Sequence, residues 1–179
     1  MNSQLIERGV RLILQGLEVS LTDQNFADTP ERVAKVYRQM FSSSEKGWAT
    51  FEEETTDLVI LRGHELYTLC PHHLLPVRMV VYLAYKPAGR VIGLSKLARM
   101  VQEVNSGPML QEAIGAKVLD LLCTLTGAQD AAIRIVGEHG CMRVRGVRTH
   151  GDVVTEKFRG AFEQDPLQGR FYQMINGRY

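Results

Sequence analysis

The stretch LVILRGHELYTLCPHHLLPVRMVVYLAY, residues 58–85, decides the fold class of this 179-residue chain. It holds three apolar, strand-like runs, at Leu58–Leu61, Leu66–Cys70 and Val77–Tyr85, and the turn residues Pro87–Gly89 follow the last of them. Three runs of this kind with no helical pattern between them favour neighbouring strands of a mainly antiparallel sheet.

Helical patterns flank this block on both sides. Apolar residues recur at helical spacing from Leu5 to Leu17, and Thr29-Pro30-Glu31 predicts the start of a second helix that runs to Phe41. The polar segment 42–57 is interpreted as a surface connection. Beyond the strands, the pattern predicts a helix over Leu97–Val104 capped by Ser95, a helix starting at Ser106–Pro108, strands at Asp130–Val136 and Val153–Phe162, and a helix over Leu167–Ile175.

Because helices and strands come in blocks, we expect an α+β fold. Residues 1–56 are predicted to form an N-terminal helical region, and residues 57–179 a single structural unit that contains the sheet. Hydrophobic residues make up 45% of the chain, so a chain of this length buries a core that needs neither a disulfide nor a metal.

The charge balance and the cysteine count narrow the class of protein. Lys and Arg number 21 against 20 Asp and Glu, so the net charge of +1 gives no bulk field for nucleic acid or an anionic membrane. Apolar runs such as Met79–Tyr85 are far shorter than the roughly 20 residues of a bilayer span. Three widely spaced cysteines do not form a disulfide framework, and we expect a cytoplasmic protein with reduced thiols.

The segment from Leu69 to Pro76 has the pattern of a metal site. Cys70 and His73 stand in C-x-x-H spacing, which lets a thiolate and an imidazole bind one tetrahedral ion, and Pro71 restricts the backbone between them. In an extended chain His72 and His73 would point to opposite sides and have different roles. The alternative is a buried cysteine beside hydrogen-bonded histidines.

A second segment, EHGCMRVRG at 138–146, offers a further ligand. If the preceding strand continues, His139, Cys141, Arg143 and Arg145 share one face of it. Cys141 would then complete a set of three zinc ligands, which leaves the open fourth position of a catalytic site. Cys123 lies in the apolar face of a predicted helix and is interpreted as a core residue.

Two further segments suit a nucleotide. Ser95, Lys96 and Arg99 at a helix start suit an anion, because backbone N–H groups and the helix dipole add to their charges. Gln111 and Glu112 place an amide beside a carboxylate, and such a pair can read the edge of a nucleobase. Taken alone, Ser95, Lys96 and Arg99 are better explained by an ordinary charged helix start, and a Gln-Glu pair on a surface helix indicates no function.

Together with DTPERVA at 28–34, these segments resemble the GTP cyclohydrolase I family. VIGLSKLAR at 91–99 and CMRVRGV at 141–147 are its most specific matches, and the resemblance extends to Phe162. It implies the tunnelling fold, an α+β fold with an antiparallel sheet, helices packed on one face and an N-terminal helical pair. It also implies a homo-oligomer, a decamer of stacked rings with active sites between subunits.

The resemblance implies a Zn²⁺-dependent reaction in which hydroxide attacks C8 of GTP, formate leaves, and rearrangement gives 7,8-dihydroneopterin triphosphate. Its implied zinc ligands are Cys70, His73 and Cys141, and its proton-transfer groups are His72 and His139. The residues that the resemblance implies for binding the pyrimidine edge of guanine are Gln111 and Glu112. Those that it implies for contact with the triphosphate are Ser95, Lys96, Arg99 and Arg145.

Three departures from the family pattern concern the substrate more than the metal. Pro71 stands where the family usually has glutamate, Asn105–Leu110 lacks an arginine pair and a glutamine, and Glu156 replaces a serine. We expect hydrolysis at C8 to survive. The alternatives are a diverged paralogue that uses another purine nucleotide or stops at the formamidopyrimidine, a nicotinamide-dependent nitrile reductase, and a nucleotide-binding scaffold without turnover.

Overall fold

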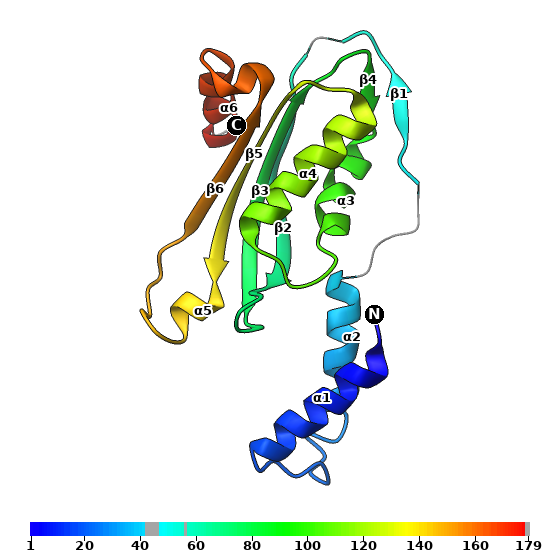
Figure 1. Ribbon diagram of the computed structural model, residues 1–179, viewed down its shortest axis with the longest axis vertical. Helices are drawn as coiled ribbons and strands as arrows, with labels where there is room; N and C mark the ends of the chain where they lie inside the picture. Colours follow the sequence, from blue (N-terminus) through cyan, green and yellow to red (C-terminus); the bar gives the residue numbers. More distant parts are fainter. Residues whose placement is uncertain (42–46, 56, 178–179) are drawn as a thin grey trace. The chain divides into compact units, whose positions relative to one another are not determined.

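The computed structural model describes residues 1–41, 47–55 and 57–177, and the chain divides into two compact units, Met1–Ser42 and Ser43–Tyr179 (Figure 1). The predicted limit between a helical region and the sheet region, at residues 56 and 57, stays a prediction, because Thr56 lies outside the described residues.

The first unit is a pair of helices, α1 (Ser3–Gly16) and α2 (Thr29–Phe41), as the sequence predicts. The side chain of Asn2 caps α1 by accepting a hydrogen bond from the Leu5 N–H at 3.1 Å. Pro30 lies in the first turn of α2, where a missing N–H leaves no helical hydrogen bond unmade. Leu14 of α1 and Ala34 of α2 are among the buried apolar residues of this unit.

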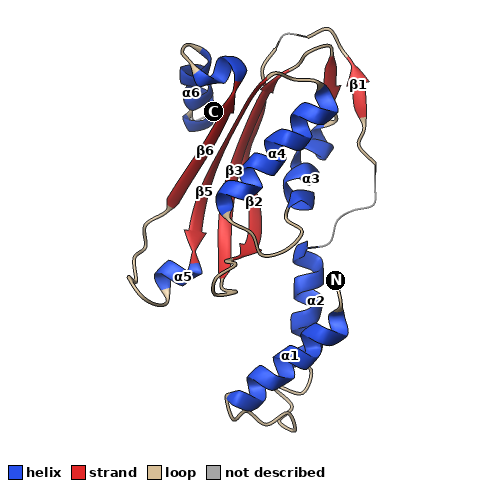
Figure 2. Cartoon of the chain, viewed as in Figure 1, coloured by secondary structure: helices blue, strands red, loops and turns tan. Residues whose placement is uncertain are grey.

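The second unit is built on a four-stranded antiparallel sheet in the order β2-β3-β5-β6 (Figure 2). The strands are β2 (Val59–Leu69), β3 (Pro76–Lys86), β5 (Asp130–His139) and β6 (Val153–Arg159). The two short strands predicted at 58–61 and 66–70 are therefore wrong, because they form one strand. Its register shifts between Leu61 and His64, and Gly63 at a φ of 64° gives the backbone the freedom for this bulge.

Helices α3 (Leu94–Val104) and α4 (Gln111–Thr126) cover one face of this sheet, as predicted (Figure 2). Alternate β3 residues such as Met79, Val81 and Leu83 pack against Ile114 and Leu122 of α4, and all five are fully buried. The opposite face carries the C-terminal helix α6 (Leu167–Asn176) and the 3-10 helix η1 (Gly160–Glu163), which form a smaller core with the β3 and β5 alanines, Ala84 and Ala132.

Two short strands, β1 (Thr50–Glu52) and β4 (Arg90–Ile92), pair with each other. The interpretation of segment 42–57 as a surface connection is thus wrong at β1, and its residues 42–46 and 56 lie outside the described residues. A three-residue strand is too short to show the period of two on which strand prediction depends.

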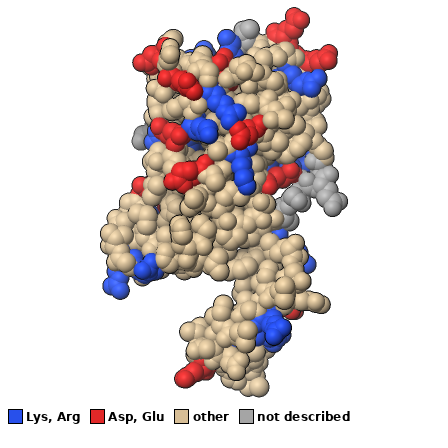
Figure 3. Space-filling model, viewed as in Figure 1, with Lys and Arg blue, Asp and Glu red and all other residues tan. Residues whose placement is uncertain are grey.

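The predicted helix starts in this unit need two corrections. The N-cap of α3 is Gly93, so Ser95 lies inside the first turn and does not cap the helix. Helix α4 begins at Gln111, not at the predicted Ser106–Pro108. None of the helices in the described residues is long and apolar enough to cross a membrane. Figure 3 shows basic and acidic side chains intermingled on the visible face of this unit.

Candidate functional site

Cys70 and His73 lie on the tight turn that joins β2 to β3. The Cys70 N–H donates to the carbonyl of Leu75 at 2.9 Å, and the Leu74 N–H donates to the carbonyl of Cys70 at 2.8 Å. Because this segment is a turn and not an extended chain, the predicted separation of His72 from His73 is wrong. Their Nδ1 atoms lie 3.9 Å and 3.7 Å from the Cys70 sulfur.

Cys141 comes from the far end of β5, on the short helix α5 (Gly140–Arg143). The strand ends at His139, so the predicted strand continuation through Arg145 is wrong. Gly140 makes the change of direction possible, because a Cβ there would lie 2.7 Å from the carbonyl oxygen of Pro76 at the start of β3. The close approach of α5 to β3 carries Cys141 to the turn that holds Cys70 and His73.

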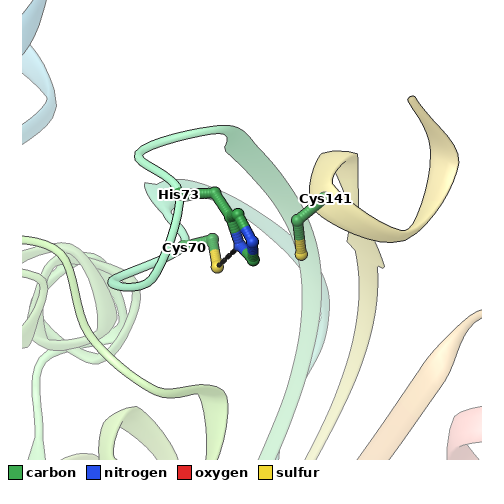
Figure 4. A group of neighbouring side chains, drawn as sticks. All are labelled: Cys70, His73 and Cys141. Carbon is green, nitrogen blue, oxygen red and sulfur yellow. Dashed lines mark hydrogen bonds between the residues drawn. The ribbon is translucent and has the colours of Figure 1, made fainter. Parts of the chain in front are cut away.

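The three side chains face one another in Figure 4, and their ligand atoms all lie within 4.8 Å of one another. Tetrahedral zinc at about 2.3 Å from sulfur holds two sulfurs about 3.8 Å apart, so the group fits zinc after a small movement. Cys70 is buried, Cys141 half-buried and His73 exposed. A set of three protein ligands, of which His73 is exposed, leaves a fourth position for water or substrate.

Neighbouring groups change the ionisation of the Cys141 thiol and place a cation beside His73. Burial raises the pKa of the Cys141 thiol, and its hydrogen bond with Cys70 adds to the effect. Metal binding would therefore have to displace a proton from Cys141. The guanidinium of Arg145 donates to Nε2 of His73, which places this predicted phosphate contact beside the candidate ligands.

His139 lies at the end of β5 and contacts the first residue of α4. Its Nε2 atom is 3.0 Å from Oε1 of Gln111. Burial lowers the pKa of the His139 imidazole, while the charge of Glu112 acts in the opposite direction. Gln111 itself is only 3% exposed, and its amide nitrogen lies 3.0 Å from each of three acceptors, the carbonyls of Ile135 and Val153 and the hydroxyl of Thr155.

A cavity of about 160 Å³ joins these parts. Its lining includes six of the predicted site residues: Cys70, His72, Gln111, Glu112, His139 and Cys141. Met109 and Leu110, from the segment Asn105–Leu110 that departs from the family pattern, also line it. The structure thus brings the candidate metal ligands, both candidate proton-transfer histidines and the Gln-Glu pair to one place, the end of the sheet where β3 begins and β5 ends.

Ser95, Lys96 and Arg99 are not part of this assembly. They lie in the first half of α3, which follows β4 at the end of the sheet opposite α5 (Figure 1). Between the two ends lies β3, whose 11 residues span about 35 Å. The Lys96 ammonium donates to the carbonyl of Gly47 at 2.7 Å. Within one chain, the anion cluster and the candidate metal group are therefore apart.

Two residues of the site were not found by sequence reasoning. Thr155 is not among the predicted site residues, although its hydroxyl accepts a hydrogen bond from the Gln111 amide. Gly137 was not singled out, although a Cβ there would lie 2.0 Å from Oε1 of Gln111. An isolated glycine inside a strand pattern is the signal that could have found it, since such a glycine marks a close approach. Cys123 is half-buried on α4 and packs against the main core.

The family model and the curated relatives that match this chain carry the same name. The sequence model of the family described as GTP cyclohydrolase I matches residues 6–176. The chain is 37% identical to GTP cyclohydrolase 1 of Clostridium perfringens over 178 residues, which cover 96% of each chain. It is 36% identical to GTP cyclohydrolase 1 of Hyperthermus butylicus, with 95% of this chain and 89% of that one covered.

Among solved structures, the apo form of the archaeosine synthase QueF-Like aligns with a TM-score of 0.44 and 17% identity, over 59% of this chain and 96% of that chain.

Proposed function

The chain belongs to the GTP cyclohydrolase I family, a family of hydrolases, and from this premise we propose that it opens the imidazole ring of GTP, releases formate and forms 7,8-dihydroneopterin triphosphate. The antiparallel sheet with α3 and α4 on one face is the chain's version of the tunnelling fold. One observation supports the reaction above all others: Cys70, His73 and Cys141 converge beside His139 at a single cavity.

We propose Zn²⁺ as the cofactor, held by Cys70, His73 and Cys141. Two thiolates and one imidazole are typical zinc ligands, and a set of three with an exposed side is typical of catalytic zinc. Zinc at this position would supply a hydroxide near neutral pH, because it lowers the pKa of water to about 7.

Side chains of the protein are proposed to transfer the protons and to bind the guanine base. His72 and His139 are proposed to transfer protons at the purine, since both line the cavity and imidazole exchanges protons near neutral pH. Glu112 is exposed at the start of α4, so its carboxylate is available to accept hydrogen bonds from the pyrimidine edge of guanine.

The triphosphate is proposed to bind Arg145 of one subunit and Ser95, Lys96 and Arg99 of a neighbouring copy. This division follows from the distance between the two ends of the sheet within one chain. In the described strand order, β2 and β6 are the outer strands and can pair with other copies. We therefore propose a homo-oligomer with active sites between subunits, in the family's form a decamer of stacked rings. A cytoplasmic location would keep the thiols reduced.

A pair of cysteine variants tests the proposal. Cys141→Ala should lose zinc and formate release from GTP, while Cys123→Ala should keep both, because Cys123 packs against the core and not beside the candidate ligands. Zinc is measured by atomic absorption and formate with formate dehydrogenase. Full formate release by metal-free Cys141→Ala would contradict the proposed zinc chemistry.

A further inference from the structure

Gln111 is placed to hold another side chain. The family resemblance gives it a contact with guanine, yet only 3% of the residue is exposed. Its Nε2 atom lies 3.0 Å from the carbonyl oxygens of Ile135 and Val153, which only accept hydrogen bonds. The amide nitrogen must therefore point at these carbonyls, since the reverse orientation would set oxygen against oxygen.

The fixed amide determines which nitrogen of His139 carries a hydrogen. With the amide in this orientation, Oε1 of Gln111 faces Nε2 of His139 at 3.0 Å. An amide oxygen only accepts, so Nε2 of His139 must donate. In the neutral imidazole, the lone pair then lies on Nδ1.

Gly137 provides the space for this contact. A Cβ on Gly137 would lie 2.0 Å from Oε1 of Gln111 and 3.1 Å from Nε2 of His139. Residues 137 and 139 share one face of β5 because side chains alternate along a strand. The missing side chain leaves a notch in the strand, and the amide oxygen of Gln111 occupies it beneath the imidazole.

We propose that Gln111 is a positioning residue for His139: it fixes the imidazole as the tautomer protonated at Nε2 and leaves Nδ1 as the proton acceptor. Gln111 then acts on the reaction through His139 and does not bind guanine. This inference rests on the proposed function, because it assigns a role within the same site. The base contact is left to Glu112.

Two kinds of variant test this role by kinetics. Gln111→Met keeps the length of the side chain without its hydrogen bonds, and it should lower kcat for formate release roughly tenfold to a hundredfold, with KM for GTP changed less than about threefold. Gly137→Ala fills the notch and should act in the same way. Gly115→Ala is the matched control, because its Cβ would make only ordinary contacts of 3.6 Å, with Ile133 and Ile135.

A spectroscopic measurement tests the tautomer in the wild-type protein. Magic-angle-spinning NMR of sedimented, zinc-loaded protein with ¹³C,¹⁵N-labelled histidine, at about pH 8 where the ring is neutral, should show His139 protonated at Nε2. His139→Asn assigns the signal. Protonation at Nδ1 would overturn the inference, and so would a Gln111→Met variant whose KM rises while kcat stays the same.

The spectrum also separates the two proposals. If no formate is released from GTP but His139 is protonated at Nε2, the proposed function fails, and what stands is that Gln111 fixes the tautomer of His139. If formate is released but His139 is protonated at Nδ1, the proposed function stands and the inference about Gln111 fails.

Discussion

Gly140→Ala provides a sharp test of how the candidate metal group is assembled. Gly140 is the first residue of α5 and lies directly before Cys141. A Cβ at this position would lie 2.7 Å from the carbonyl oxygen of Pro76 and 3.6 Å from the Cβ of Leu75. The backbone oxygen belongs to a paired residue of β3, opposite Leu69, and cannot turn away as a flexible side chain could.

The clash sets the size of the expected effect. Relief of the contact needs a separation of α5 from β3 by about 0.5 Å, an overpacking that costs about 1–3 kcal/mol. Cys141 moves with α5, whereas Cys70 and His73 stay on the turn. Metal sites tolerate displacements of about 0.2 Å in ligand distance, so we expect zinc affinity to fall roughly 10- to 100-fold.

The assay is a zinc competition titration against a chromogenic chelator, with urea unfolding measured in parallel. Gly151→Ala is the control, since its Cβ would make only an ordinary 3.5 Å contact with the Thr149 hydroxyl. Wild-type zinc affinity in a folded Gly140→Ala protein would refute the reasoning, because it would mean that the Gly140 contact with Pro76 does not position Cys141.

Three further predictions concern other parts of the chain. Lys96→Ala should weaken GTP binding roughly 10- to 100-fold and guanosine binding little, because it removes one charged phosphate contact; equal effects on both ligands in a binding titration would remove Lys96 from the phosphate site. Burial, together with the Glu156 hydrogen bond, raises the pKa of Tyr172 to about 12. A raised pKa favours the protonated phenol in the folded protein, so this stabilisation is present below about pH 10 and is lost as the pH rises toward 12; urea unfolding should show that loss in the wild type and not in Tyr172→Phe. Gly160→Ala combines a φ of 60° with a Cβ only 2.6 Å from a backbone carbonyl, and should destabilise by about 2–4 kcal/mol; Gly127→Ala, with a positive φ in open space, should lose only about 1 kcal/mol, and equal losses in urea unfolding would contradict the role of the clash.

The sequence predicts those parts of the fold that have strong local patterns. The helices α1, α2 and α6 and the long strands β3 and β5 have apolar periods over many residues, so their type follows from the pattern. The short strands β1 and β4 have only three residues each and could not be predicted in this way.

In the site, too, features set by local spacing were predictable from the sequence, whereas features set by contacts between distant residues were not. The spacing of Cys70 and His73 predicts two ligands on one turn, and the structure brings Cys141 to them. The route by which Cys141 arrives was not predictable, because α5 depends on the fit of Gly140 against Pro76, two residues far apart in the sequence. The burial of Gln111 likewise depends on Gly137, which lies 26 positions away in the sequence and has no side chain with which to signal a role.

The most direct test of the account follows GTP that carries carbon-13 at C8, incubated with the zinc-loaded protein. We expect one labelled formate for each 7,8-dihydroneopterin triphosphate, the first detected by carbon-13 NMR and the second by fluorescence after oxidation and dephosphorylation. Labelled formate without pterin would contradict the proposed rearrangement, and unchanged GTP in the presence of bound zinc would contradict the proposed reaction as a whole.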